Sequence, residues 1–213
     1  MNIMHPRRLS LVLALILTAV APLARAQIVL YDNTDTATSG NAIIAETMTI
    51  GDSFSTGAAD VNLTSFSAVL GLTAHGSGST TFSLFTDAGA HPGTLITSLA
   101  SIDDTSLTGT FTEYTFSGLS VALTASTRYW LMAESTGVAR WISSPNDGGT
   151  GVAGEYLIAA GTVYSNTDGP WAMSVTATAV PEPATYALLG GTLALALGLI
   201  ARRQRRKTAL VRP

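Results

Sequence analysis

The stretch Thr80-Thr81-Phe82-Ser83-Leu84-Phe85 alternates polar and apolar side chains over most of its length. A period of two is typical of a β-strand with one buried and one solvent-facing side. Clusters of Gly, Pro, Asn, Asp and Ser separate this stretch from similar runs and are typical of turns. The runs rich in β-branched and aromatic residues are 28–31, 61–70, 80–85, 94–102, 111–116, 128–133, 138–143, 155–160 and 173–179. They predict an all-β fold, an antiparallel β-sandwich of jelly-roll type.

The composition of the whole chain narrows the classes of protein to consider. Of its 213 residues, 46% are hydrophobic, and this apolar content excludes a disordered chain. The chain has no cysteine, which excludes disulfides, thiolate metal sites and a cysteine nucleophile. Only 12% of the residues are charged, which is unusual for a soluble protein. The next question is therefore where the apolar residues lie along the chain.

The first 26 residues have the pattern of a secretory signal peptide. Arg7 and Arg8 precede an apolar run at 9–20, and Ala24 and Ala26 form an A-x-A cleavage site. We therefore expect the mature chain to begin after Ala26. The alternative is an N-terminal membrane anchor, but the apolar run is shorter than the roughly 20 residues that a helical span needs.

A second apolar segment lies near the other end of the chain. Residues 184–201 carry no charge, and 18 helical residues extend about 27 Å, which suffices for a bilayer core. The pattern predicts a transmembrane helix whose basic tail stays in the cytoplasm, so that the preceding chain lies outside the inner membrane. A buried core helix is the alternative. The basic cluster that follows comprises Arg202, Arg203, Arg205, Arg206 and Lys207.

Pro181-Glu182-Pro183 stands directly before this segment. Because each proline fixes its own φ and restricts the residue before it, the tripeptide is extended, the conformation that a protease needs. Residues 181–213, with the tripeptide, the apolar span and the basic cluster in this order, resemble the PEP-CTERM sorting signal. The resemblance implies recognition and cleavage by an exosortase in a Gram-negative bacterium that makes extracellular polysaccharide. A permanently anchored single-pass protein is the alternative.

The remaining segment, residues 27–180, is acidic. It contains two basic and thirteen acidic residues, a formal charge of −11, and so offers no basic patch for nucleic acid. The sequences Val-Leu-Tyr-Asp-Asn at 29–33, Asp-Ser-Phe-Ser-Thr-Gly at 52–57 and Thr-Arg-Tyr-Trp-Leu at 127–131 resemble the choice-of-anchor R domain, as do the strand patterns between them. This resemblance implies a bacterial surface module and no particular activity.

Catalytic patterns are weak in this segment. His75 and His91 stand at turn positions without a nucleophile motif or metal spacing. We interpret most of the acidic residues as a solvated face and predict that the protein is not an enzyme; the exposed Arg128 and Arg140 are expected to pair with acids. The acids considered as a glycosidase pair are Asp103, Asp104, Glu113, Glu134 and Glu155.

Two binding hypotheses remain open. Asp32 and Asp35 supply hard oxygen ligands within one loop and are candidates for a structural calcium site, although turn-forming residues explain the same pattern. The candidates for a sugar-binding aromatic platform are Trp130, Trp141, Trp171 and Tyr129. Neighbouring strand residues face opposite sides, so one ring of Tyr129 and Trp130 would face outward. Aromatic residues on sandwich strands are more often core.

Taken together, these patterns predict an exported protein that is held at the inner membrane, cut by an exosortase and passed to the cell surface or matrix. Its expected role is structural or adhesive and linked to exopolysaccharide. A carbohydrate-binding module is the alternative role.

Overall fold

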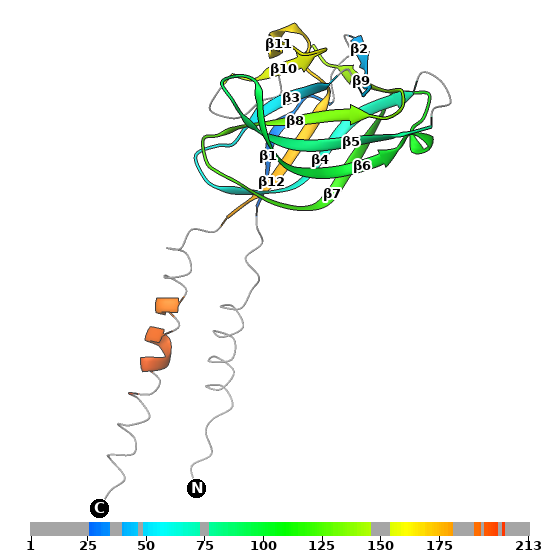
Figure 1. Cartoon of the computed structure of the whole chain (residues 1–213). Coiled ribbons are helices and arrows are strands. Elements are labelled where there is room, and N and C mark those ends of the chain that lie inside the picture. Colours follow the sequence, from blue (N-terminus) through cyan, green and yellow to red (C-terminus); the bar gives the residue numbers. More distant parts are fainter. Residues whose placement is uncertain are drawn as a thin grey trace, which may run out of the picture. The chain divides into compact units, whose positions relative to one another are not determined.

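The computed structural model describes residues 26–34, 40–46, 49–72, 77–145, 154–180, 190–192, 194–199 and 202. Within these residues the regular structure is mostly β-strand (Figure 1). Two 3-10 turns, η1 (Asp104–Ser106) and η2 (Asn166–Asp168), interrupt the strands. The strands are β1 (Gln27–Asp32), β2 (Gly40–Ile43), β3 (Ile50–Ser55), β4 (Val61–Leu72), β5 (Ser79–Asp87), β6 (Pro92–Asp103), β7 (Thr112–Leu123), β8 (Arg128–Ser135), β9 (Ala139–Ser143), β10 (Tyr156–Ala159), β11 (Thr162–Ser165) and β12 (Met173–Ala179).

The strands form two antiparallel sheets of six strands each. Sheet 1 has the order β1-β12-β4-β9-β2, with β7 also paired to β4, and sheet 2 has the order β11-β10-β3-β8-β5-β6. Eight of these strands, paired as β1-β12-β4-β7 and β3-β8-β5-β6, follow the order of a jelly roll, in which the chain crosses repeatedly from one sheet to the other. The predicted all-β sandwich is therefore confirmed.

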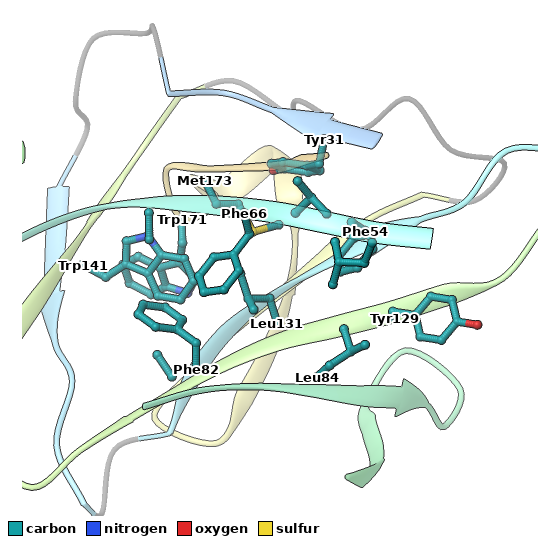
Figure 2. Packing of buried hydrophobic residues seen from close by; sticks show 14 of the residues in the cluster. Tyr31, Phe54, Phe66, Phe82, Leu84, Tyr129, Leu131, Trp141, Trp171 and Met173 are labelled. Atoms are coloured by element: carbon teal, nitrogen blue, oxygen red, sulfur yellow. The ribbon is translucent and has the colours of Figure 1, made fainter. Parts of the chain in front are cut away.

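The core lies between the two sheets and is rich in aromatic side chains. Phe66 of β4 packs against Phe82 of β5 and Phe116 of β7, with ring centroids 5.2 and 4.7 Å apart. Phe82 in turn meets Trp141 edge-on at 5.4 Å, so rings from both sheets interlock (Figure 2). Each buried ring removes a large apolar area from water, and this burial is the main favourable term for a core without disulfides.

All nine predicted strand regions are strands in the structure, but three further strands were not predicted. β3 begins Ile50-Gly51-Asp52-Ser53, and Gly, Asp and Ser together favour a turn. β2 and β11 have only four residues each, too few for an alternating pattern to be distinguished. Tertiary pairing with β8 and β10, not local propensity, makes residues 50–55 a central strand.

Four short strands are additions to the jelly roll, and they gather in one region of the sandwich (Figure 1). β9 pairs with β2 and with the last residues of β4, while β10 and β11 form a hairpin whose first strand pairs with Gly51 and Asp52. These additions extend sheet 1 and sheet 2 beyond the eight-stranded framework. They bound the cleft described below.

Residues Ala26–Val180 form a compact unit of their own. In the second unit, residues 190–192 and 194–199 are helical. Among the residues that the structure describes, no helix is long and apolar enough to cross a membrane. The predicted span at 184–201 lies partly outside the described residues, and the predicted signal peptide lies almost entirely outside them.

Candidate binding cleft

The aromatic platform predicted at Trp130 and Trp141 is wrong, because both side chains are 0% exposed. Trp141 belongs to the core between the sheets, where its indole Nε1 donates to the Ala172 carbonyl at 2.8 Å. Trp130 does face away from Tyr129, as strand alternation requires, but it lies in a second buried cluster with Met132 and Ile158. Neither ring is available to a ligand at the surface.

The second cluster borders a network of charged groups. The Trp130 Nε1 donates to Asp87 Oδ1 at 2.9 Å, and Arg128 pairs with Asp87 and Glu155 at 3.5 and 3.8 Å. Arg128 also stacks over the Tyr156 ring at 4.8 Å. The predicted pairing of Arg128 with acids is thus confirmed, whereas its predicted exposure is wrong, since its side chain is only 14% exposed.

Arg140 is likewise not an exposed residue. It is half-buried, and its Nε atom is buried without a hydrogen-bond partner in the part of the chain that the structure describes. No ion pair of Arg140 occurs among those residues.

A cleft of about 620 Å³ opens where the added strands of the two sheets approach one another. Its volume is within the range of about 300–1,000 Å³ found for small-molecule sites. Sheet 1 contributes Gly40 and Asn41 from β2 and Ser143 from β9. Sheet 2 contributes Leu157 and Ala159 from β10 and Tyr164 from β11, and the segment before β12 contributes Gly169 and Trp171.

The lining combines aromatic and uncharged polar groups. Tyr164 is 43% exposed and Asn41 is also exposed, so the cleft is open to solvent on their side. None of the lining residues that the structure describes carries a charge. At Gly40, an added Cβ would lie 3.3 Å from the Ser143 hydroxyl oxygen, so the absence of a side chain lets β2 approach β9 closely.

Trp171 is held firmly at the buried side of the cleft. Its backbone pairs with Ser143 of β9, and its indole Nε1 donates to the Ile158 carbonyl of β10 at 3.2 Å. The indole ring also stacks on Trp141, with centroids 6.1 Å apart and planes 30° apart (Figure 2). Trp171 thereby connects the two sheets and fixes the shape of the cleft.

Asp52 supports Trp171 from within the sandwich. This fully buried carboxylate accepts hydrogen bonds from the Trp171 backbone N–H at 2.8 Å and from Asn166 Nδ2 at 2.9 Å. Asn166 Nδ2 also donates to the Tyr31 hydroxyl at 3.1 Å. Burial raises the pKa of Asp52 well above its ordinary value; the nearby Glu155 carboxylate adds to the rise, and the hydrogen bonds oppose it.

Of the five acids considered for catalysis, three are exposed and two are buried, which agrees with the prediction that most of them form a solvated face. Glu113 and Glu134 are exposed, as expected of a solvated face. Glu155 is buried and accepts from the Ser53 hydroxyl at 2.7 Å. Asp103 is exposed and accepts from the backbone N–H of Thr105, as in a turn. Asp104 is buried and accepts from the Thr80 hydroxyl at 3.2 Å.

No carboxylate pair lines the cleft among the described residues. His91 is exposed at a turn, and His75 lies outside the described residues.

Asp32, one of the two calcium candidates, closes a local turn. Its Oδ1 atom accepts from the backbone N–H and the hydroxyl of Thr34 at 3.2 and 2.9 Å. Asp35 lies outside the described residues, and no group of three or more potential metal ligands occurs among those that are described. The calcium site stays a prediction.

Most residues of the predicted sorting and cleavage signals lie outside the described part of the chain. Ala26 and Arg202 are described. The residues outside it are Ala24, Pro181, Glu182, Pro183, Arg203, Arg205, Arg206 and Lys207.

Sequence reasoning missed the cleft and its support. Asp52 lies in β3, a strand that was not predicted. Asn41 and Tyr164 lie on β2 and β11, which have only four residues each and were not predicted either. Trp171, which directly follows the turn sequence Asp168-Gly169-Pro170, is the one lining residue that was among the predicted aromatic candidates. Binding residues often lie on loops that a rigid scaffold positions, so its place beside a turn was the available signal.

Comparisons with known proteins do not show a family. No protein-family model matches the chain, and no curated protein matches it. Solved structures with some likeness include that of the infectious bursal disease virus Gx strain, with 10% sequence identity and a TM-score of 0.25. The crystal structure of the infectious bursal disease virus VP2 subviral particle has 11% identity and a TM-score of 0.22. In both cases the match covers 85% of this chain and about half of the other, 48% and 47%. TM-scores this low support no inference about fold or function.

Proposed function

We propose that this chain is an exported surface or matrix protein of a Gram-negative bacterium, sorted and cut by an exosortase. The observation that carries the proposal is the order of three segments in the sequence. An extended tripeptide, Pro181-Glu182-Pro183, precedes the uncharged residues 184–201, and a cluster of five basic residues within 202–207 follows. The signal-peptide pattern at 1–26 supports export.

Each segment has a physical task in this proposal. The two prolines keep the backbone at 181–183 extended, and Glu182 offers a charge for recognition by the protease. The apolar segment holds the protein in the inner membrane, and the basic cluster keeps the tail in the cytoplasm. The cut releases the sandwich from its anchor, so the protein is the substrate of this reaction.

The role that we propose for the sandwich is structural or adhesive and linked to exopolysaccharide. A sandwich whose core is built from interlocking aromatic rings suits an extracellular protein without cysteine. Its negative charge keeps it soluble after release.

The test is the processing of the full chain in its native host. Replacing Pro181-Glu182-Pro183 with three alanines is expected to abolish the shorter processed form, seen by immunoblotting, and to leave the protein in the inner-membrane fraction. The matched control is Thr208→Ala/Leu210→Ala, which changes the tail beyond the basic cluster and is expected to be processed normally.

Two outcomes would contradict the proposal. If the triple-alanine variant is processed and delivered like the wild type, the tripeptide is not a sorting signal. If the wild type itself stays full-length in the membrane fraction of a host that has an exosortase, the protein is permanently anchored instead.

A further inference from the structure

We propose that the cleft between β2, β9, β10 and β11 binds an uncharged sugar unit of a carbohydrate chain. The inference rests on the cleft alone and goes beyond the proposed sorting function, which concerns residues 181–213. Of the aromatic residues expected to form a platform, only Trp171 lines this cleft, and Trp130 and Trp141 are fully buried elsewhere.

The charge of the site selects a neutral ligand. The described lining residues offer no cation to neutralise a carboxylate, sulfate or phosphate group. The segment that contains the cleft, residues 27–180, has a formal charge of −11. Asp52, whose carboxyl group accepts from the Trp171 backbone and from Asn166, is buried. A polyanion would therefore be repelled without compensation.

The lining offers both an aromatic ring and polar groups, which suit the C–H faces and the hydroxyl groups of a sugar ring. The faces of a pyranose carry C–H groups with a small positive charge, which are attracted to the negative face of an aromatic ring. Tyr164 exposes such a ring at the cleft. The rim of a sugar carries hydroxyls that both donate and accept, and the Asn41 side chain provides one acceptor and two donors for them.

The cleft is also built in advance of binding. Trp171 is fixed by backbone pairing to β9, by the hydrogen bond from Nε1 to Ile158 and by the Asp52 carboxylate below it. A rigid wall loses little conformational entropy when a ligand binds, so even the modest contacts of an open cleft contribute to affinity. Tyr164, on the short strand β11, also lines the cleft and is exposed to solvent.

The experiment measures binding by the full chain, purified in a zwitterionic detergent that has no sugar headgroup. Isothermal titration calorimetry is carried out with neutral oligosaccharides of glucose, galactose, mannose and xylose, and with an oligogalacturonate as the anionic comparison. We expect saturable binding of at least one neutral oligosaccharide and weaker binding of the anionic one.

Variants locate the binding site. Tyr164→Ala and Asn41→Ala are each expected to weaken binding about 3- to 10-fold, as the loss of one aromatic or one polar contact would. Tyr164→Phe keeps the ring and is expected to bind like the wild type. Leu95→Ala, at an exposed apolar position of β6 that is not part of the cleft lining, is the control for surface changes elsewhere.

Three results would overturn the inference. These are no saturable binding of any neutral oligosaccharide up to about 1 mM, tighter binding of the anionic chain, and equal affinity in the wild type, Tyr164→Ala and Asn41→Ala. None of them bears on the processing of residues 181–183, so the two proposals can fail separately.

Discussion

Asp52 is a carboxyl group in the interior of the sandwich, where an aspartate is rarely buried. Its two oxygens accept hydrogen bonds from different donors, the Trp171 backbone N–H and Asn166 Nδ2. These bonds offset part of the desolvation of the charge, but burial remains the largest influence and raises the pKa. A single residue thus orders the segment before β12 and makes the stability of the protein depend on pH.

The sign of this pH dependence follows from the raised pKa. At a pH below about 3.9, the ordinary aspartate value, Asp52 is protonated in both the folded and the unfolded chain. As the pH rises above that value, the unfolded chain releases the proton while the folded chain retains it. The contribution of Asp52 to stability is therefore present at low pH and is lost as the pH rises through the folded-state pKa.

Asp52→Asn is expected to remove this pH dependence. An asparagine can accept from the Trp171 N–H and, after rotation of the Asn166 amide, donate to Asn166 Oδ1, which has no hydrogen-bond partner within the described part of the chain. Urea unfolding of the full chain, followed by tryptophan fluorescence between pH 3 and pH 8, should show the variant gaining stability relative to the wild type as the pH rises. A constant difference across this range would contradict the prediction.

Asp103→Asn is a control, because the contribution of Asp103 to stability should depend on pH in the opposite direction. Hydrogen bonds from the side chain and backbone of Thr105 lower the pKa of the exposed Asp103. Its stabilising contribution is therefore present above the ordinary aspartate pKa and is lost as the pH falls. We expect this variant to be less stable than the wild type at neutral pH and nearly equal to it at pH 3.

At the scale of elements, η1 and the turn after β8 both meet the start of β5, at the ends of these strands. The Asp104 N–H, in η1, donates to the Gly78 carbonyl before β5, and the Thr136 N–H, in the turn after β8, donates to the Ser79 carbonyl. The Asp104 side chain completes the junction by accepting from the Thr80 hydroxyl and the Val138 N–H. Gly137 passes so close to this carboxylate that it has no room for a side chain.

Gly137→Ala is expected to destabilise this junction. A Cβ atom there would lie 1.8 Å from Asp104 Oδ2 and 3.0 Å from its Cγ, so the buried carboxylate would have to leave its partners. Overpacking and the loss of a buried hydrogen bond together predict a decrease of about 2–4 kcal/mol in the free energy of unfolding. Chemical denaturation measures the decrease.

Gly109→Ala is the matched control for this substitution. An added Cβ at Gly109 meets no atom within 4 Å, so we expect no loss of stability. Equal stability of Gly137→Ala and Gly109→Ala would contradict the tight approach of Gly137 to Asp104.

The junction and the cleft show what the sequence could and could not predict about the elements. Strands such as β5 and β12 alternate in hydrophobicity, so their existence and the two-layer architecture follow from local patterns. The local sequence of β3 favours a turn, and the segment is a strand because β8 and β10 pair with it. The cleft depends on such long-range pairing, since residues from β2 and β11 lie more than a hundred positions apart in the sequence. A single sequence contains no signal for that proximity.

At the scale of the whole molecule, the negative charge of the sandwich affects both its solubility and its stability. Residues 27–180 contain two cations, and one of them, Arg128, is occupied by Asp87 and Glu155. Six acids among the described residues are exposed and repel one another across the surface, namely Asp32, Glu46, Asp60, Asp103, Glu113 and Glu134. This repulsion favours solubility after export but opposes the compact state.

Screening this repulsion with salt should stabilise the sandwich. At 0.1 M ionic strength the screening length is about 10 Å, and at 1 M it is about 3 Å, so interactions between surface acids weaken strongly over this range. We expect the melting temperature of the full chain at pH 7.5 to rise by a few degrees between about 0.02 M and about 0.5 M NaCl. The double variant Glu46→Gln/Glu134→Gln removes two exposed acids that are not among the described ion-pair partners of Arg128, and its melting temperature should therefore rise less with salt. If the melting temperature falls with salt, attraction rather than repulsion dominates the surface; an equal rise in both proteins would instead assign the effect to salt acting on apolar burial.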